Sequence, residues 1–148
     1  MTFGRASVYL DAGHDVIDAT FLRDGDTWYR FSANAQGGGG RGSGVGEHIL
    51  IERGAAIDAP DFTTVRVDVG HPELTRGEGP AVFSDAEGTT HYLLIDEFLG
   101  RGYQLFRTAD VASGDWEHVS NAQLPPGARH GSVISISLDE YTMLKELT

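Results

Sequence analysis

Short runs of apolar and β-branched residues, separated by turn signals, dominate the first half of the chain. Residues 63–69 alternate apolar and polar side chains with a period of two, which is the pattern of a half-buried strand. An Asp-Gly pair at Asp24 and Gly25 lies between two such runs and predicts a β-hairpin. The predicted strands cover residues 6–10, 17–22, 27–31, 47–52 and 63–69.

The second half of the chain repeats this pattern. Its predicted strands cover residues 81–83, 91–96, 103–107 and 116–119, and a last apolar run follows at 132–136. Residues 138–147, with the acidic side chains of Asp139 and Glu140 near their start, predict a short C-terminal helix. The glycine-rich residues 36–46 predict a flexible loop. The chain is therefore predicted to be all-β apart from one helix.

Composition limits the class of protein and its partners. The 148 residues are 40% hydrophobic, which is enough for the core of a single domain over residues 1–148. The net charge of -11 would repel a phosphate backbone or an anionic membrane, so we expect no nucleic-acid and no membrane partner. The first residues lack the basic start and apolar core of a signal peptide, and no apolar stretch approaches the roughly 20 residues needed to span a bilayer, so we expect neither feature in these 148 residues. The lack of cysteine leaves the compartment open, either cytoplasmic or secreted as part of a longer protein.

An internal repeat connects the two halves. Asp18, Glu78 and His130 each precede small or turn-forming residues and then an apolar run, and they are separated by 60 and 52 residues. Four strands in every such interval are typical of β-propeller blades, whose inner strands meet at a central channel. A β-sandwich would also give many short strands, but it does not explain the recurring ionisable residue.

The repeat therefore predicts a partial β-propeller with three ionisable groups near one axis. Its units are two four-stranded blades at residues 5–70 and 77–121 and a closing strand at residues 129–137. Each group also has an ordinary structural interpretation. Glu78 could lie in a turn before a strand, Asp18 could cap a turn, and His130 could be a hydrogen-bonded core histidine.

Several motifs, in this order and spacing, resemble those of glycoside hydrolase family 43. They are Ile17-Asp18-Ala19-Thr20, Trp28-Tyr29-Arg30-Phe31, Glu78-Gly79-Pro80, Tyr92-Leu93-Leu94-Ile95-Asp96, Gly102-Tyr103 and Arg129-His130-Gly131-Ser132-Val133. The resemblance covers nearly the whole chain. It implies a five-bladed propeller that cleaves arabinofuranosides or xylosides with inversion, using three carboxylates in a central pocket.

The resemblance also implies roles for single residues. Glu78 resembles the general acid, Asp18 resembles the carboxylate that keeps that acid protonated and oriented, and His130 resembles a histidine that helps to hold a calcium ion through water. An inverting glycosidase needs such an acid together with a carboxylate base on the far side of the sugar. We expect the substrate-binding residues to be Trp28, Phe98, Tyr103 and Arg129, although the aromatic ones could equally be core residues.

The chain departs from the family in one respect, because it offers no candidate for the general base. In the family it comes from the first blade, and this chain resembles the later ones. We therefore expect a portion of an inverting hydrolase of plant cell-wall polysaccharide that is inactive alone, with an oligosaccharide as its substrate. Exposed sheet edges predict a homo-oligomer or missing N-terminal blades as partners. The alternative is a non-catalytic propeller module that self-assembles and binds carbohydrate or serves as a scaffold.

Overall fold

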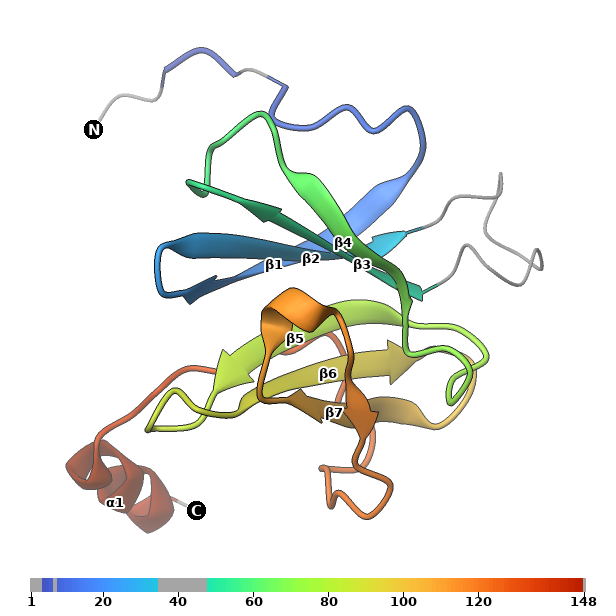
Figure 1. The fold of residues 1–148 in the computed structure, drawn as a ribbon. Coiled ribbons are helices and arrows are strands. Elements are labelled where there is room, and N and C mark those ends of the chain that lie inside the picture. Colours follow the sequence, from blue (N-terminus) through green and yellow to red (C-terminus); the bar gives the residue numbers. More distant parts are fainter. Residues whose placement is uncertain (1–3, 7, 35–47, 148) are drawn as a thin grey trace.

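The computed structural model describes residues 4–6, 8–34 and 48–147 and contains two antiparallel four-stranded sheets, one above the other in Figure 1. Sheet A has the order β1 (Val16–Asp24), β2 (Thr27–Asn34), β3 (His48–Gly54) and β4 (Thr63–Val69). Sheet B has the order β5 (Glu78–Ser84), β6 (His91–Glu97), β7 (Gly102–Thr108) and β8 (Glu117–His118). A 3₁₀ turn, η1 (Val111–Ser113), precedes β8, and α1 (Leu138–Glu146) follows the sheets.

In both sheets, neighbours in sequence are neighbours in space, as in the blades of a propeller. The inner strands β1 and β5 contact each other. The prediction of an all-β chain with two four-stranded units, a partial propeller-like arrangement and a short C-terminal helix is confirmed. The predicted hairpin is also present, since Asp24 pairs with Thr27 across a two-residue turn in which Gly25 has φ +56°.

One hydrophobic core lies between the two sheets. Sheet A contributes Phe31, Ile49 and Ile51, and sheet B contributes Leu93 and Ile95, all of them fully buried. These residues come from the middle strands, where the alternation of side chains turns every second residue toward the facing sheet. Because the two sheets bury a common core, the inner strands β1 and β5 are held beside each other.

Two predicted strands are not formed. Among residues 6–10, the described positions have no strand, because the chain passes outside sheet A and is fixed there by Tyr9. The Tyr9 hydroxyl donates to the carbonyl oxygen of Ile57 at 2.5 Å, and its ring packs edge-on against Phe21. Residues 131–137, within the predicted closing strand at 129–137, form no strand and pair with none of the described strands. Residues 36–46, the predicted flexible loop, lie outside the described part.

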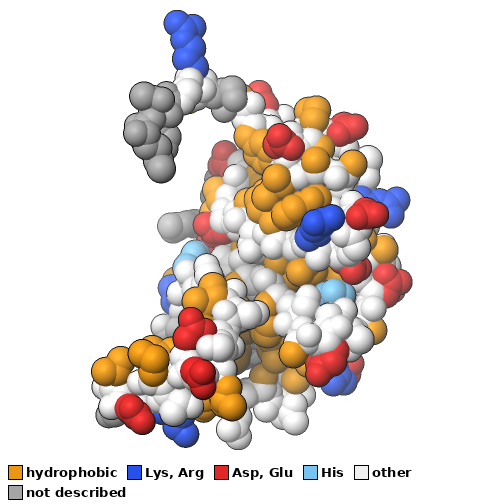
Figure 2. Space-filling model, turned by 90° about the vertical axis from the view of Figure 1, so that its left-hand side faces the viewer, with side chains coloured by type: hydrophobic (Ala, Val, Ile, Leu, Met, Phe, Trp, Pro, Cys, Tyr) orange, Lys and Arg blue, Asp and Glu red, His pale blue; other side chains and the backbone are white. Residues whose placement is uncertain are grey.

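The C-terminal helix begins where the sequence predicts. The Ser137 side chain accepts from the Glu140 backbone N–H, and the Glu140 carboxylate accepts from the Ser137 backbone N–H, which is a capping box. No residue of α1 is buried. Hydrophobic side chains are exposed both in α1 and in residues 131–137 before it, among them Ile134 and Leu138, each 78% accessible. Figure 2 views the molecule from the side on which α1 lies in Figure 1 and shows apolar groups at the surface. No helix in the described part is long and apolar enough to cross a membrane.

Candidate active site

A matching irregularity marks the inner strand of each sheet. The register shifts between Ile17 and Thr20 in β1 and between Glu78 and Ala81 in β5. Within these bulges Asp18 has φ +57° and Gly79 has φ +54°, so the two residues occupy the same left-handed position. The structural repeat therefore pairs Asp18 with Gly79. The sequence had paired Asp18 with Glu78, which is one residue earlier.

This offset brings the two strands into direct contact. The Gly79 backbone N–H donates to Asp18 Oδ2 at 3.1 Å, so the carboxylate of one sheet binds the bulge of the other. One ligand atom each from Asp18, Glu78 and His130 lie within 4.8 Å of one another. The three ionisable groups of the predicted repeat thus converge on one point. There β1 and β5 meet residues 129–131, which we call the C-terminal segment.

A buried carboxylate lies across the sheet from Glu78. Asp96 is paired in register with Glu78 and its side chain is fully buried. The Arg129 guanidinium donates from Nε to Asp96 Oδ2 at 2.5 Å and from Nη2 to Glu78 Oε1 at 3.2 Å. The hydrogen bond and the charge of Asp96 raise the pKa of Arg129 above its ordinary value. Arg129 therefore bridges the two carboxylates and is bound more closely to Asp96.

His130 completes the cluster from the chain segment next to Arg129. Its Nε2 atom lies 3.2 Å from Glu78 Oε1 and 3.5 Å from Asp96 Oδ2, and its Nδ1 atom lies 3.8 Å from Asp18 Oδ2. Like Asp18, it is a non-glycine residue with positive φ, at +49°. Backbone strain of this kind is concentrated at functional sites, where the surrounding structure imposes it.

Tyr103 ties the C-terminal segment to β5. Its hydroxyl accepts from the Gly131 N–H at 2.6 Å and donates to the Gly79 carbonyl oxygen at 3.3 Å. Burial raises the pKa of the Tyr103 hydroxyl, and the negative charges of Asp96 and Asp18 add to this, whereas the Gly131 N–H opposes it. A protonated hydroxyl is the form that can make both bonds at once.

A hollow opens beside this cluster. Its volume is about 320 Å³, which is at the lower end of the range of ligand-binding pockets. The residues that line it include Asp18, Thr20, Pro80, His130 and Ser132. Asp18 and His130 thus line a space that a small polar ligand can enter, and Glu78 lies behind them, 3.2 Å from His130.

The predicted site residues divide into three groups. Glu78, Asp18, His130, Arg129 and Tyr103 are brought together. Phe98 lies on the β6–β7 turn at the same end of sheet B, with the Arg76 guanidinium 5.1 Å from its ring centre. Trp28 is not brought to the cluster, because it pairs with Arg23 beside the β1–β2 turn, at the opposite end of sheet A.

Asp96 is the site residue that the sequence analysis did not single out. It lies within a quoted motif, and the available signal was a charged residue at the end of an apolar strand, Tyr92-Leu93-Leu94-Ile95-Asp96. The Asp96 Oδ1 atom is buried without a hydrogen-bond partner among the described residues. A buried carboxylate oxygen of this kind indicates a functional role or a bound water molecule.

The resemblance predicts a calcium ion near His130. Calcium binds six to eight oxygen ligands, among them water molecules. Asp18 and Glu78 offer carboxylate oxygens near His130, within 4.8 Å of one another, and the Glu78 Oε1 atom is also within 3.2 Å of Arg129. Two carboxylates would supply only part of such a site, with water as the other ligands, and the calcium ion stays a prediction.

The chain was also compared with known proteins. A family model described as a probable glycosyl hydrolase domain, and named as related to family 43, matches residues 1–142. No curated protein and no solved structure matches the chain. The matched range includes both sheets and all the clustered residues.

Proposed function

The chain belongs to this family of probable glycosyl hydrolase domains related to glycoside hydrolase family 43, and from that membership we propose that it supplies the acid side of a glycosidase active site. The family match agrees with the motif resemblance. The observation that carries the proposal is the convergence of Asp18, Glu78 and His130 beside a hollow of about 320 Å³.

In the proposed mechanism Glu78 donates a proton to the glycosidic oxygen as the bond to the leaving group breaks. Its side chain is 23% exposed, and its Oε1 atom lies 3.2 Å from Nε2 of His130, which lines the hollow, so the carboxyl group would be next to a sugar bound there. Asp18 lies within 4.8 Å of it, in the position of the carboxylate that orients the acid in the family. The Gly79 N–H fixes Asp18 in this position.

Arg129 would bind the substrate from the other side of Glu78. Its Nε bond to Asp96, at 2.5 Å, is shorter than its 3.2 Å contact with Glu78, so Asp96 is the main counter-ion of the guanidinium. A guanidinium has five N–H donors, and the side chain of Arg129 is 47% exposed. N–H groups not used by Asp96 or Glu78 would donate to sugar hydroxyls next to the hollow, with Tyr103 holding residues 129–131 in place through the Gly131 N–H.

Asp18 cannot be the base that activates water opposite Glu78. Inverting glycosidases separate acid and base by about 6.5 to 9.5 Å to admit a water molecule, whereas Asp18 and Glu78 have oxygens within 4.8 Å. Asp96 is unsuited because its side chain is fully buried. We therefore infer that the base comes from outside these residues, from further blades or from another copy, and that the chain alone is inactive.

The proposed substrates are arabinofuranosides or xylosides of plant cell-wall polysaccharide, cleaved with inversion, as the family resemblance implies. The test uses phenyl arabinofuranoside and phenyl xyloside, whose leaving group needs protonation, with azide as an external nucleophile in place of the base. We expect no hydrolysis by the chain alone, and formation of the glycosyl azide that Glu78→Gln abolishes. Azide product that is unchanged in Glu78→Gln would overturn the assignment of Glu78 as the acid.

A second candidate is a non-catalytic module that self-assembles. It is favoured by residues 131–137, which pair with none of the described strands and in which Val133, Ile134 and Ile136 are exposed. Pairing of residues 131–137 with another copy would cover these side chains. Light scattering would then give a dimer or larger species at micromolar concentration, and deletion of residues 131–148 would return it to a monomer. A monomeric full chain would exclude this candidate.

A further inference from the structure

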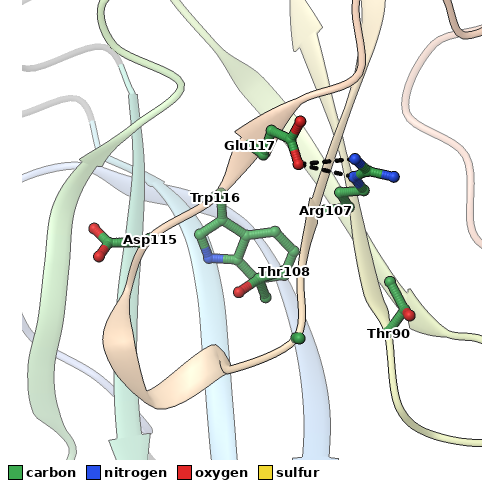
Figure 3. Close-up of a pocket in the computed structure, with 7 residues that line it drawn as sticks. Thr90, Arg107, Thr108, Asp115, Trp116 and Glu117 are labelled. Carbon is green, nitrogen blue, oxygen red and sulfur yellow. Dashed lines mark hydrogen bonds and ion pairs between the residues drawn. The ribbon is translucent and has the colours of Figure 1, made fainter.

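A second hollow, of about 530 Å³, opens at the other end of sheet B, and Figure 3 shows the side chains that line it. Strand β7 connects the two places, because Tyr103 lies in the candidate active site near its start and Thr108 lines this hollow at its end. Five residues of strand span about 17 Å. The hollow is therefore a separate place on the surface.

The aromatic side chain in this hollow, Trp116, is packed against the hydrophobic core. Its ring packs edge-to-face on Phe31, with the ring centres 5.8 Å apart. The residues on either side make exposed ion pairs, Asp115 with Arg66 at 3.5 Å and Glu117 with Arg107 at 2.9 Å. A ligand that stacks on Trp116 would therefore meet a surface that needs little ordering on binding.

The lining matches one class of ligand better than others. Arg107 donates from Nε to Glu117 Oε2 at 3.0 Å, so the two charges largely cancel. Asp115 and the net charge of -11 disfavour an anion. The hydroxyl groups of Thr90 and Thr108 add polar partners, while Trp116 is the one aromatic surface. Such a mixture suits a neutral ligand with many hydroxyl groups and one apolar face, which describes a sugar ring.

We propose that this hollow is an accessory binding site for a neutral saccharide. A sugar ring stacks on Trp116, and its hydroxyls bond with Arg107 and Glu117. The inference rests on the proposed function, because a hydrolase of polysaccharides has a long substrate that can occupy two places at once. Binding at one place raises the effective concentration of the chain at the other, so even a weak accessory site increases retention on the polymer.

The test is a titration of the full chain with xylotetraose and with arabinotetraose, followed by backbone amide NMR. The signals of Thr108 and Glu117 report on the accessory hollow, and those of Gly79 and Gly131 report on the candidate active site. We expect saturable shifts at Thr108 and Glu117 that persist in Glu78→Gln. Trp116→Ala should weaken this binding about tenfold or more, as truncation of a central aromatic contact does.

Two further variants keep the test valid if Trp116→Ala does not fold. Trp116→Phe keeps a ring packed on the core and should weaken binding by a smaller factor. Arg107→Ala should weaken it too, whereas Arg23→Ala, which removes an exposed ion pair in the β1–β2 turn, should leave it unchanged. Shifts confined to Gly79 and Gly131 would overturn the accessory site and leave the proposed function standing. Shifts confined to the Trp116 hollow would support the accessory site and count against the proposed function.

Discussion

The inner strands of the two sheets share one backbone irregularity and use it differently. In β1 the residue at the left-handed position is Asp18, whose side chain joins the carboxylate cluster. In β5 that position is Gly79, and the side chain that joins the cluster comes from Glu78, one residue earlier. The glycine N–H donates to Asp18, so one bulge supplies the acceptor and the other supplies the donor. The difference shows how two similar strands can form one asymmetric site.

The sheets also differ in how much of the site they contribute. Sheet A provides Asp18 alone among the clustered carboxylates, whereas sheet B provides Glu78 and Asp96 and holds the C-terminal segment through Tyr103. Sheet A is therefore mainly the support against which the site is assembled. Substitutions in sheet A should act through stability, and those in sheet B should change local contacts of the site.

The largest effect is expected from the buried ion pair of sheet A. Arg30 is 3% exposed and donates to Glu52 across β2 and β3 at 2.7 Å. Glu52→Gln would leave a buried guanidinium without its counter-ion, which typically costs about 3–5 kcal/mol. Urea denaturation should show this loss in the free energy of unfolding. The double variant Arg30→Met with Glu52→Leu should lose much less. An unchanged midpoint for Glu52→Gln would show that sheet A does not depend on the pair.

The corresponding ion pair of sheet B ties the β6–β7 turn. Burial tends to raise the pKa of Glu97, but hydrogen bonds from Arg101 and Thr75 outweigh it and hold the pKa below its ordinary value. The resulting stabilisation is present above the unfolded pKa of about 4.3 and is lost as the pH falls through the folded pKa.

Glu97→Gln should therefore lower the free energy of unfolding by about 1–3 kcal/mol at neutral pH, since it weakens charge-assisted hydrogen bonds to a buried group. It should also flatten the decline of stability at acid pH. Thermal unfolding between neutral and acid pH measures both. The exposed Glu87→Gln is the control and should change neither quantity. If the pH profiles of Glu97→Gln and wild type run parallel, the carboxylate does not contribute as described.

Much of this architecture follows from the sequence, and the exceptions have physical causes. Period-two alternation and the Asp24-Gly25 turn predicted the strands and the hairpin, because these depend on local residues. Residues 6–10 and 131–137 have the composition of strands, but a strand also needs a partner, and composition does not show whether one is present. The distance of Trp28 from the cluster depends on which end of its strand it occupies, and the composition of its motif does not show this.

The sequence predicted most of the residues that meet in the candidate site, but not which positions of β1 and β5 are equivalent. The repeat correctly placed Asp18 and Glu78 near each other. It could not show that a bulge shifts the equivalence by one residue, because a bulge leaves no fixed pattern in the sequence. Asp96 was missed because its role depends on cross-strand pairing with Glu78, which is a property of the sheet.

The comparison of the two bulges can be tested at Gly79. A Cβ atom there would combine a positive φ with an approach of 3.1 Å to the His130 ring. Gly79→Ala should destabilise the chain by about 1–2 kcal/mol for the backbone alone, with an added cost from His130. Gly88→Ala is a matched control, because Gly88 also has positive φ but no neighbour within 4 Å. Gly79→Ala should cost less in a His130→Ala background, and equal costs in both backgrounds would exclude the contact.

The smallest effect is expected at Tyr103, whose hydroxyl links Gly79 to Gly131. Tyr103→Phe should cost about 1 kcal/mol and speed hydrogen exchange of the Gly131 amide about fivefold, because that N–H loses its acceptor. The raised pKa of Tyr103 predicts that its contribution to the free energy of unfolding is present at neutral pH and is lost only as the pH rises through the folded value, above about 10, where the hydroxyl can no longer donate to Gly79. Tyr92→Phe, whose ring stacks on Phe83, is the control and should leave Gly131 unchanged. If Gly131 exchanges equally in wild type and Tyr103→Phe, sheet B does not hold the C-terminal segment through this hydroxyl, and Arg129 must be positioned by Asp96 alone.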